Sequence, residues 1–108
     1  TRSYSVTGVQ TCLFRSMDLF IIEDEVYAPL IDRQEAPIQA QAPERTYYLT
    51  NLSKIVAPGL RVGFLVVPPA RQRHVEAAMA ASVWMTPPLM GELAARWIAD
   101  GTGSIFNA

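Results

Sequence analysis

The chain has 108 residues, half of them hydrophobic, and a formal net charge of -1 at pH 7. This composition is typical of a globular protein, and no apolar run approaches the roughly 20 residues that a membrane-spanning helix needs. No basic block predicts nucleic-acid binding by this segment, and the single cysteine, Cys12, excludes a disulfide or metal framework, so a reducing cytoplasm is the expected compartment.

Residues 6–16, VTGVQTCLFRS, show neither a helical nor a strand period. The codons GTG ACT GGA GTT CAG ACG TGT encode residues 6–12 and resemble a common short-read sequencing adapter. The adapter's continuation encodes residues 13–16 once one base is skipped. We therefore predict that residues 1–16 are translated adapter, not native, and that the native sequence begins near Met17. A natural variable loop or a signal peptide is the alternative, but a signal peptide needs a basic start, an apolar run and a small-residue cleavage site, which are absent.

Three strands are predicted next. The run LFII at residues 19–22 is short and continuously apolar, which is typical of a strand buried on both faces in a parallel sheet. Residues 28–45 are rich in proline and polar side chains and predict a connection. Residues 46–52 predict a second strand, and residues 60–68 predict a third after a Pro-Gly turn. Because the loop between the last two is too short for a crossover helix, we expect them to be antiparallel.

Two helices are predicted after the strands. Residues 69–85 begin with proline and are rich in alanine, and Val75, Met79 and Val83 share one face at helical spacing. We expect Thr86 to cap a second helix that has a proline in its first turn and ends at residues 100–101. His74 and the two tryptophans are interpreted as helix surface and core, without a functional role.

Lysine is rare in this chain, because eight of its nine basic residues are arginine and the remaining one is Lys54. Arginine serves as the surface cation here, so a lone lysine suggests chemistry that a guanidinium cannot perform. An amine can lose its proton and attack a carbonyl, whereas arginine stays protonated. An ordinary surface lysine is the alternative, and composition does not decide between the two.

Four groups with complementary chemistry lie near predicted strand ends: Asp24, Tyr27, Lys54 and Arg61. In open α/β sheets, ligands bind at the carboxyl ends of the strands. A phosphorylated pyridine aldehyde needs an amine for its aldehyde, a carboxylate for its ring nitrogen, a partner for its ring hydroxyl and a bidentate cation for its phosphate. Taken singly, Asp24 could be a cap, Tyr27 a core residue and Arg61 half of a surface ion pair.

The stretch IIEDEVY followed by YLTNLSKIVAPGLRVGFLVVP resembles the fold-type I pyridoxal-phosphate aminotransferases of class I/II. It is most similar to the branch that includes the aminotransferase-like domains of MocR-type transcriptional regulators of the GntR family. The family patterns are D-x-x-Y and S/T-x-S-K-x-x-x-P-G-L-R-x-G, and both have counterparts here in the family's order, with Asn51 at the S/T position. The resemblance extends through WMTPPLMGELAARWIADGT and covers nearly all of residues 17–102.

This resemblance implies a set of roles around pyridoxal 5'-phosphate. Lys54 looks like the Schiff-base lysine, Asp24 like the partner of the pyridinium nitrogen and Tyr27 like the partner of the ring hydroxyl. Ser53 and Arg61 look like phosphate ligands.

Asn51 departs from the family pattern, because a hydroxyl residue usually precedes the lysine by three positions. An amide can still donate a hydrogen bond to phosphate, but it is bulkier. Glu23 and Glu25 flank Asp24 on the strand, where side chains alternate between faces. We therefore expect these two glutamates to point away from the site and to be solvated or structural.

The implied fold is α/β, with residues 17–108 forming part of the large domain of the fold-type I PLP-dependent transferase fold. That part comprises three strands of a mostly parallel sheet, one of them antiparallel, plus two helices. The family's glycine-containing phosphate loop, cofactor-stacking aromatic and substrate-clamping arginine are missing, and the C-terminal GSIFNA does not continue the family's helix. We therefore expect a fragment without its small domain and N-terminal part.

Three functional hypotheses agree with this resemblance. The first is a fragment of a cytoplasmic, homodimeric aminotransferase that exchanges an amino group between an amino acid and a 2-oxo acid. The second is the effector-sensing domain of a MocR-type regulator, which would bind DNA only through a missing N-terminal helix-turn-helix domain. The third is that the fragment does nothing alone. None of these hypotheses requires a membrane or a metal ion.

Overall fold

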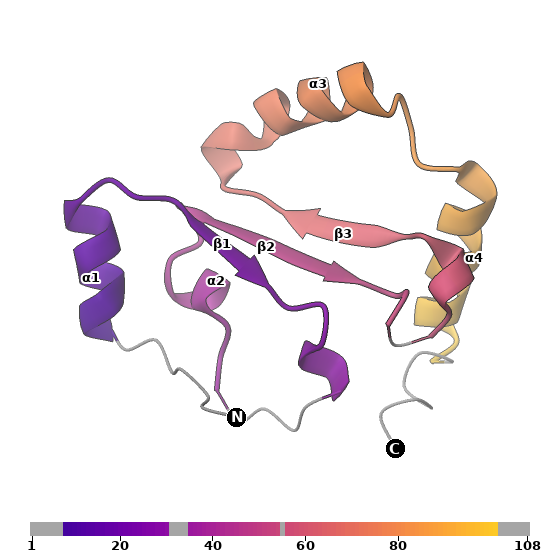
Figure 1. Ribbon diagram of the computed structural model, residues 1–108, viewed down its shortest axis with the longest axis horizontal. Helices are drawn as coiled ribbons and strands as arrows, with labels where there is room; N and C mark the ends of the chain where they lie inside the picture. Colours follow the sequence, from indigo (N-terminus) through magenta and orange to yellow (C-terminus); the bar gives the residue numbers. More distant parts are fainter. Residues whose placement is uncertain (1–7, 31–34, 55, 102–108) are drawn as a thin grey trace.

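The computed structural model describes residues 8–30, 35–54 and 56–101. Three strands form one sheet in the order β1-β2-β3: β1 (Ile21–Asp24), β2 (Thr46–Asn51) and β3 (Gly63–Val66). The first two are parallel and the last two are antiparallel, as Figure 1 shows. The antiparallel pairing confirms the direction expected from the short loop between β2 and β3.

The first strand lies two residues later than predicted. The Leu19 N–H donates to the Phe14 carbonyl at 3.0 Å, so residue 19 closes the preceding helix and does not pair with a strand. Pairing begins where the Ile21 N–H donates to the Arg45 carbonyl at 3.0 Å. This shift brings Glu23 and Asp24 into β1 itself.

The third strand is shorter than the predicted residues 60–68. Residues Pro58–Leu60 form the 3-10 turn η2, and Arg61 comes next with a left-handed backbone, φ 53°. At the other end, β3 stops before Pro68, which is followed by the turn η3 (Pro69–Arg71). Proline has no N–H and cannot extend the ladder of hydrogen bonds between strands. The two turns therefore limit β3 to four residues.

Both predicted helices are present, as α3 (Gln72–Ser82) and α4 (Pro88–Ala99). Thr86 does not cap α4. Its N-cap position is Pro87, which makes no side-chain cap bond, while Pro88 stands in the first turn as predicted. Gly101 follows the helix with φ 77°, which confirms the predicted end. Trp84 is not a core residue, because it is 78% exposed in the connection between α3 and α4.

Two further helices occur where none was predicted, α1 (Gly8–Ser16) and α2 (Ile38–Gln41). Although residues 6–16 showed neither a helical nor a strand period, Gly8–Ser16 form α1. Its C-terminal end is held by the fold, since the Arg45 guanidinium donates to the Phe14 carbonyl at 3.0 Å and Arg15 pairs with Glu44 at 2.8 Å. The adapter origin of this segment stays a prediction, and residues 1–7 and the C-terminal GSIFNA lie outside the described residues.

Among the described residues, the buried core is small. Leu60, Val62 and Ala94 form its centre, and partly buried side chains pack around them: Leu52, Ala57, Met90, Leu93 and Trp97. The burial on both faces predicted for the first strand is not observed, because Ile22 in β1 is 75% exposed. All four residues of β3 are exposed as well. In Figure 1, α3 lies beyond β3 and away from β1, so it does not cover the sheet.

The dimensions agree with this incomplete cover. The accessible surface is 8054 Å², whereas a folded monomer of this mass exposes about 5,900 Å². The radius of gyration is 15.7 Å, against about 13 Å for a compact domain of this length. Within the described part of the chain, no helix combines the length and apolarity needed to cross a membrane.

Candidate functional site

Parallel pairing of β1 and β2 brings two predicted site residues to one end of the sheet. Asp24 is the last residue of β1 and pairs with Leu49, and Asn51 is the last residue of β2. Lys54 follows Asn51 by three residues, with Ser53 beside it. Asp24 and Lys54 therefore lie at the carboxyl ends of adjacent strands, where ligands gather in α/β sheets.

The third strand brings Arg61 to the same end. Because β3 is antiparallel to β2, its first residue, Gly63, pairs with Asn51. Arg61 stands two residues before Gly63, with its left-handed backbone at the turn into the strand. Its side chain is exposed. All six predicted site residues thus belong to one end of the sheet.

Tyr27 and Lys54 come together across the site. The Lys54 Nζ lies 5.9 Å from the centroid of the Tyr27 ring, within the range of a cation–π contact. Tyr27 is 57% exposed, so the alternative that it is a core residue is wrong. The turn after β1 carries it, with the Ala28 N–H donating to Glu25 and the Leu30 N–H donating to Tyr27. A phenol and a primary amine therefore share one solvent-accessible region.

Asp24 and Asn51 each support the turn that comes after its strand. The Asp24 carboxylate accepts the Val26 N–H at 3.2 Å, and the Asn51 side-chain oxygen accepts the Lys54 N–H at 3.3 Å. Such Asx-type bonds hold the chain after a strand in a defined direction. The Asn51 carbonyl oxygen is thereby engaged, which leaves the amide NH2 as the group that can donate to a phosphate oxygen.

Ser53 differs from the other site residues in its burial. It is only 9% exposed, whereas Lys54 beside it is exposed. Because it is buried, the Ser53 hydroxyl can donate a hydrogen bond only to a ligand that reaches into the turn after β2.

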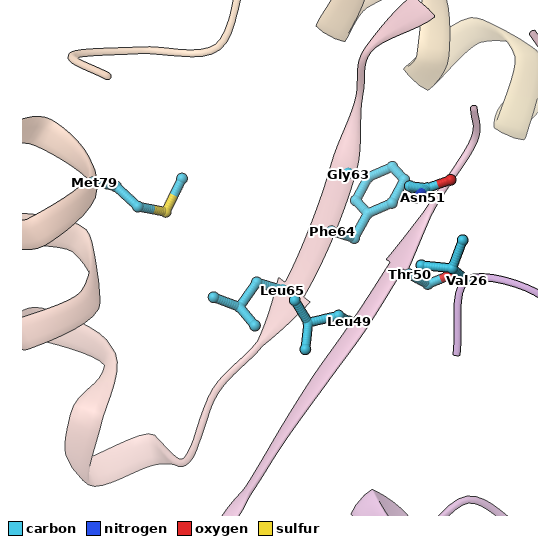
Figure 2. Close-up of a pocket in the computed structure, with 8 residues that line it drawn as sticks. All are labelled: Val26, Leu49, Thr50, Asn51, Gly63, Phe64, Leu65 and Met79. Atoms are coloured by element: carbon cyan, nitrogen blue, oxygen red, sulfur yellow. The ribbon is translucent and has the colours of Figure 1, made fainter. Parts of the chain in front are cut away.

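A cavity of about 350 Å³ lies between the ends of β2 and β3 and helix α3. Figure 2 shows its lining, which is mostly apolar: Val26, Leu49, Thr50, Asn51, Gly63, Phe64, Leu65 and Met79. Its volume is at the lower end of the range of small-molecule pockets, about 300–1,000 Å³. Of the six predicted residues, only Asn51 lines it. Asp24, Tyr27 and Lys54 lie at the sheet end outside this lining.

Apart from Asn51, sequence patterns did not assign the cavity residues to a site. Leu49 and Leu65 are partners in the β2–β3 register, and Met79 comes from the apolar side of α3. Such residues have the same spacing as ordinary core positions, so no pattern distinguishes them. Among the residues that the structure describes, no three His, Cys, Asp or Glu side chains lie close enough to hold a metal ion.

Comparisons with known proteins give one informative relative. No protein-family model matches the chain, and no solved structure matches it. The chain is 33% identical over 89 residues to an uncharacterized HTH-type transcriptional regulator, YdeF, of Bacillus subtilis strain 168. The match covers 82% of this chain but 19% of that protein, so the chain spans about a fifth of the length of the curated relative. The sequence is therefore similar to one segment of a transcriptional regulator.

Proposed function

We propose that this chain is part of the effector-sensing domain of a helix-turn-helix transcriptional regulator, and that this domain has an aminotransferase-like fold and holds pyridoxal phosphate through Lys54. The observation that carries the proposal is the similarity to a regulator over 82% of the chain. It favours the regulator hypothesis over the aminotransferase hypothesis, although both would use the same residues.

The donor set at the sheet end fits pyridoxal phosphate. One end of the sheet offers a carboxylate, a phenol, an amine, an amide and a guanidinium. The amine is exposed and close to the phenol, and the amide has its NH2 available. These are the groups that a phosphorylated pyridine aldehyde requires.

When bound, pyridoxal phosphate supplies an electrophilic carbonyl and an electron-withdrawing ring. Lys54 would provide the nucleophilic amine, and it can do so only after losing its proton to solvent or to a neighbouring base. Asp24 would hold a proton on the ring nitrogen, and the Tyr27 hydroxyl would donate a hydrogen bond to the ring oxygen. The phosphate would be bound by the remaining residues of the set: Asn51, Ser53 and Arg61.

A regulator and an enzyme differ in the step that comes after ligand binding. In the regulator, an amino compound that displaces the Lys54 amine would change the contacts at the sheet end and thereby the position of the DNA-binding domain. In the enzyme, the freed Lys54 amine would move the α-proton of an amino acid, with Lys54 acting as general base. The same displacement thus serves sensing in one case and catalysis in the other.

The experiment uses the full-length protein that carries this segment. Purified protein is mixed with pyridoxal phosphate, and its visible absorbance, its binding to the DNA upstream of its own gene, and amino-group transfer to 2-oxo acids are measured. We expect a visible band, DNA binding that an amino compound alters, and no transfer. Transfer at enzymatic rates without DNA binding would favour the aminotransferase hypothesis, and absence of the visible band would contradict the cofactor proposal.

A further inference from the structure

Glu23 is an unusual residue in this structure because it is a charged side chain with only 5% of its surface exposed. Its two carboxylate oxygens are both used. Oε1 accepts the Ile38 N–H at 2.8 Å, and Oε2 accepts the Gln39 N–H at 2.9 Å. A buried carboxylate is stable only when such donors replace its lost hydration, so this pair of bonds explains how the side chain can be buried.

The two N–H groups belong to the first turn of α2. The first N–H groups of a helix have no carbonyl partner within the helix and need another acceptor. The N-cap position of α2 is Pro37, which makes no side-chain cap bond. Glu23, fifteen residues away along the chain in strand β1, therefore supplies the acceptors that a capping residue would normally supply.

This clamp joins β1 to the connection that leads from β1 to β2. The helix α2 itself contains no buried residue, but Ala42 at its C-cap is fully buried and its carbonyl accepts the Thr46 hydroxyl at 2.8 Å. The bidentate contact of Glu23 holds the start of α2, whereas Ala42 holds its end. The Glu23 contact ties the middle of the connection to the same strand end from which the connection starts.

The clamp also determines which way Asp24 faces. Successive side chains on a strand point to opposite faces, so with Glu23 held on the α2 side, Asp24 must point to the other side. In the observed register Glu23 pairs with Tyr48 and Asp24 pairs with Leu49. A slip of one residue would exchange the faces of the two acids and would leave a buried carboxylate without donors.

We propose that Glu23 is a positioning residue of the candidate site: it fixes the carboxyl end of β1 so that Asp24 and the following turn with Tyr27 face Lys54. This inference rests on the proposed function for its consequence, cofactor binding, but not for the clamp itself. Glutamine cannot replace glutamate here, because its NH2 group would meet one of the two N–H donors.

The test compares Glu23→Gln with Glu92→Gln in the full-length protein. Glu92 is a matched control, since it pairs with Arg96 on the exposed surface of α4. Amide hydrogen exchange is measured without cofactor over residues 24–27 and 38–39, and pyridoxal phosphate binding is followed by its visible absorbance at several pH values.

For Glu23→Gln we expect exchange at least tenfold faster at residues 38–39 and also faster at residues 24–27. We also expect cofactor affinity at least tenfold weaker and an altered pH dependence of the visible band. Glu92→Gln should change none of these. Faster exchange confined to residues 38–39, with unchanged cofactor binding, would overturn the proposal, because Glu23 would then be only a helix cap.

Two outcomes separate this inference from the proposed function. If the unaltered protein binds no pyridoxal phosphate, the proposed function fails, and the exchange at residues 24–27 still decides whether Glu23 positions the strand end. If Glu23→Gln does not fold, the unaltered protein decides: protection of the Ile38 and Gln39 amides comparable to that of the β1–β2 ladder supports the clamp. Exchange at the rate of an open loop overturns it.

Discussion

Lys54 is the residue on which the cofactor proposal depends, because it is the chain's sole primary side-chain amine. Its exposed position beside Tyr27 allows a carbonyl compound to reach it. An arginine at the same place would keep the positive charge and the cation–π contact but not the nucleophile. Substitution of Lys54 by alanine and by arginine therefore distinguishes the effect of the positive charge from that of the nucleophilic amine.

In the full-length protein we expect Lys54→Ala and Lys54→Arg each to abolish the visible absorbance of bound pyridoxal phosphate. The measurement is an absorption spectrum after removal of free cofactor. Arg73→Ala, on the exposed surface of α3, serves as the control and should keep the band. A band retained in either Lys54 variant would mean that a lysine outside this segment holds the cofactor.

At the scale of elements, α1 is attached to the fold by charged contacts. The Arg15 side chain donates a hydrogen bond to the Glu44 carboxylate at 2.8 Å and a second one to the Gln41 carbonyl at 2.9 Å. The hydrogen bond from Arg15, more than its charge, lowers the pKa of Glu44 below its usual value, and the same pairing raises the pKa of Arg15. Both groups are exposed, so water and salt screen this pairing.

This pairing predicts a pH dependence with a definite sign. A carboxyl whose pKa is lower in the folded state contributes stability above its unfolded pKa, and this contribution is lost as the pH falls through the folded pKa. We expect Arg15→Ala to raise the pKa of Glu44 toward its ordinary value and to reduce this acid-sensitive contribution, whereas the backbone hydrogen bond and the Arg45 side chain continue to lower the pKa. An NMR titration of the Glu44 carboxyl measures the shift. Arg96→Ala on α4 should leave the pKa of Glu44 unchanged. An equal shift of this pKa in the Arg96 variant would contradict a specific contact between Arg15 and Glu44.

Alanine substitutions at two glycines, one inside α4 and one just after its end, should change the free energy of unfolding in opposite directions. Gly91 lies inside the helix, and a Cβ added there would meet no atom within 4 Å, so Gly91→Ala should stabilise the helix by about 0.5–1 kcal/mol. Gly101 has φ 77°, a left-handed conformation that costs other residues about 1 kcal/mol or more, so Gly101→Ala should destabilise it. Thermal melting followed by circular dichroism at low protein concentration compares the two. Two shifts of the same sign would show that Gly101 is not needed to end α4.

At the scale of the whole molecule, the sheet has exposed apolar residues and unpaired edges. The Leu52 N–H donates to the Val62 carbonyl at 3.1 Å, so in the alternating antiparallel ladder Gly63 and Leu65 turn their N–H and C=O groups outward. Among the described residues, no further strand pairs with this edge of β3. The strand GFLV carries no charge that would discourage pairing with another chain.

We therefore expect the 108-residue chain, expressed alone, to self-associate and to hold no cofactor. Size-exclusion chromatography with light scattering at several concentrations measures the association. Leu65→Lys should reduce it, because a charge on an edge strand opposes pairing, whereas Ala77→Lys on the exposed surface of α3 should not. A monodisperse monomer whose cooperative melt rises with pyridoxal phosphate would contradict this expectation.

Several features were determined by local sequence alone. The short loop before β3 requires an antiparallel partner, Pro88 can begin a helix, and Gly101 can end one. These features depend on φ, ψ and loop length, which neighbouring residues control. Asp24 and Lys54 were expected at one end of the sheet because each is close to the end of a predicted strand, and Asp24 is the last residue of β1 while Lys54 follows the last residue of β2 by three positions.

Other features were decided only by tertiary contacts. The start of β1 depends on the bond from the Ile21 N–H to the Arg45 carbonyl, and the burial of Glu23 depends on two N–H groups of α2. The helix α1 was not expected from the sequence, and its end is held by Arg45 from far along the chain. In each case a hydrogen bond reaches a group that lies far away along the chain. Local patterns cannot specify such partners, because they exist only after the strands have paired and the connection has folded back onto the sheet.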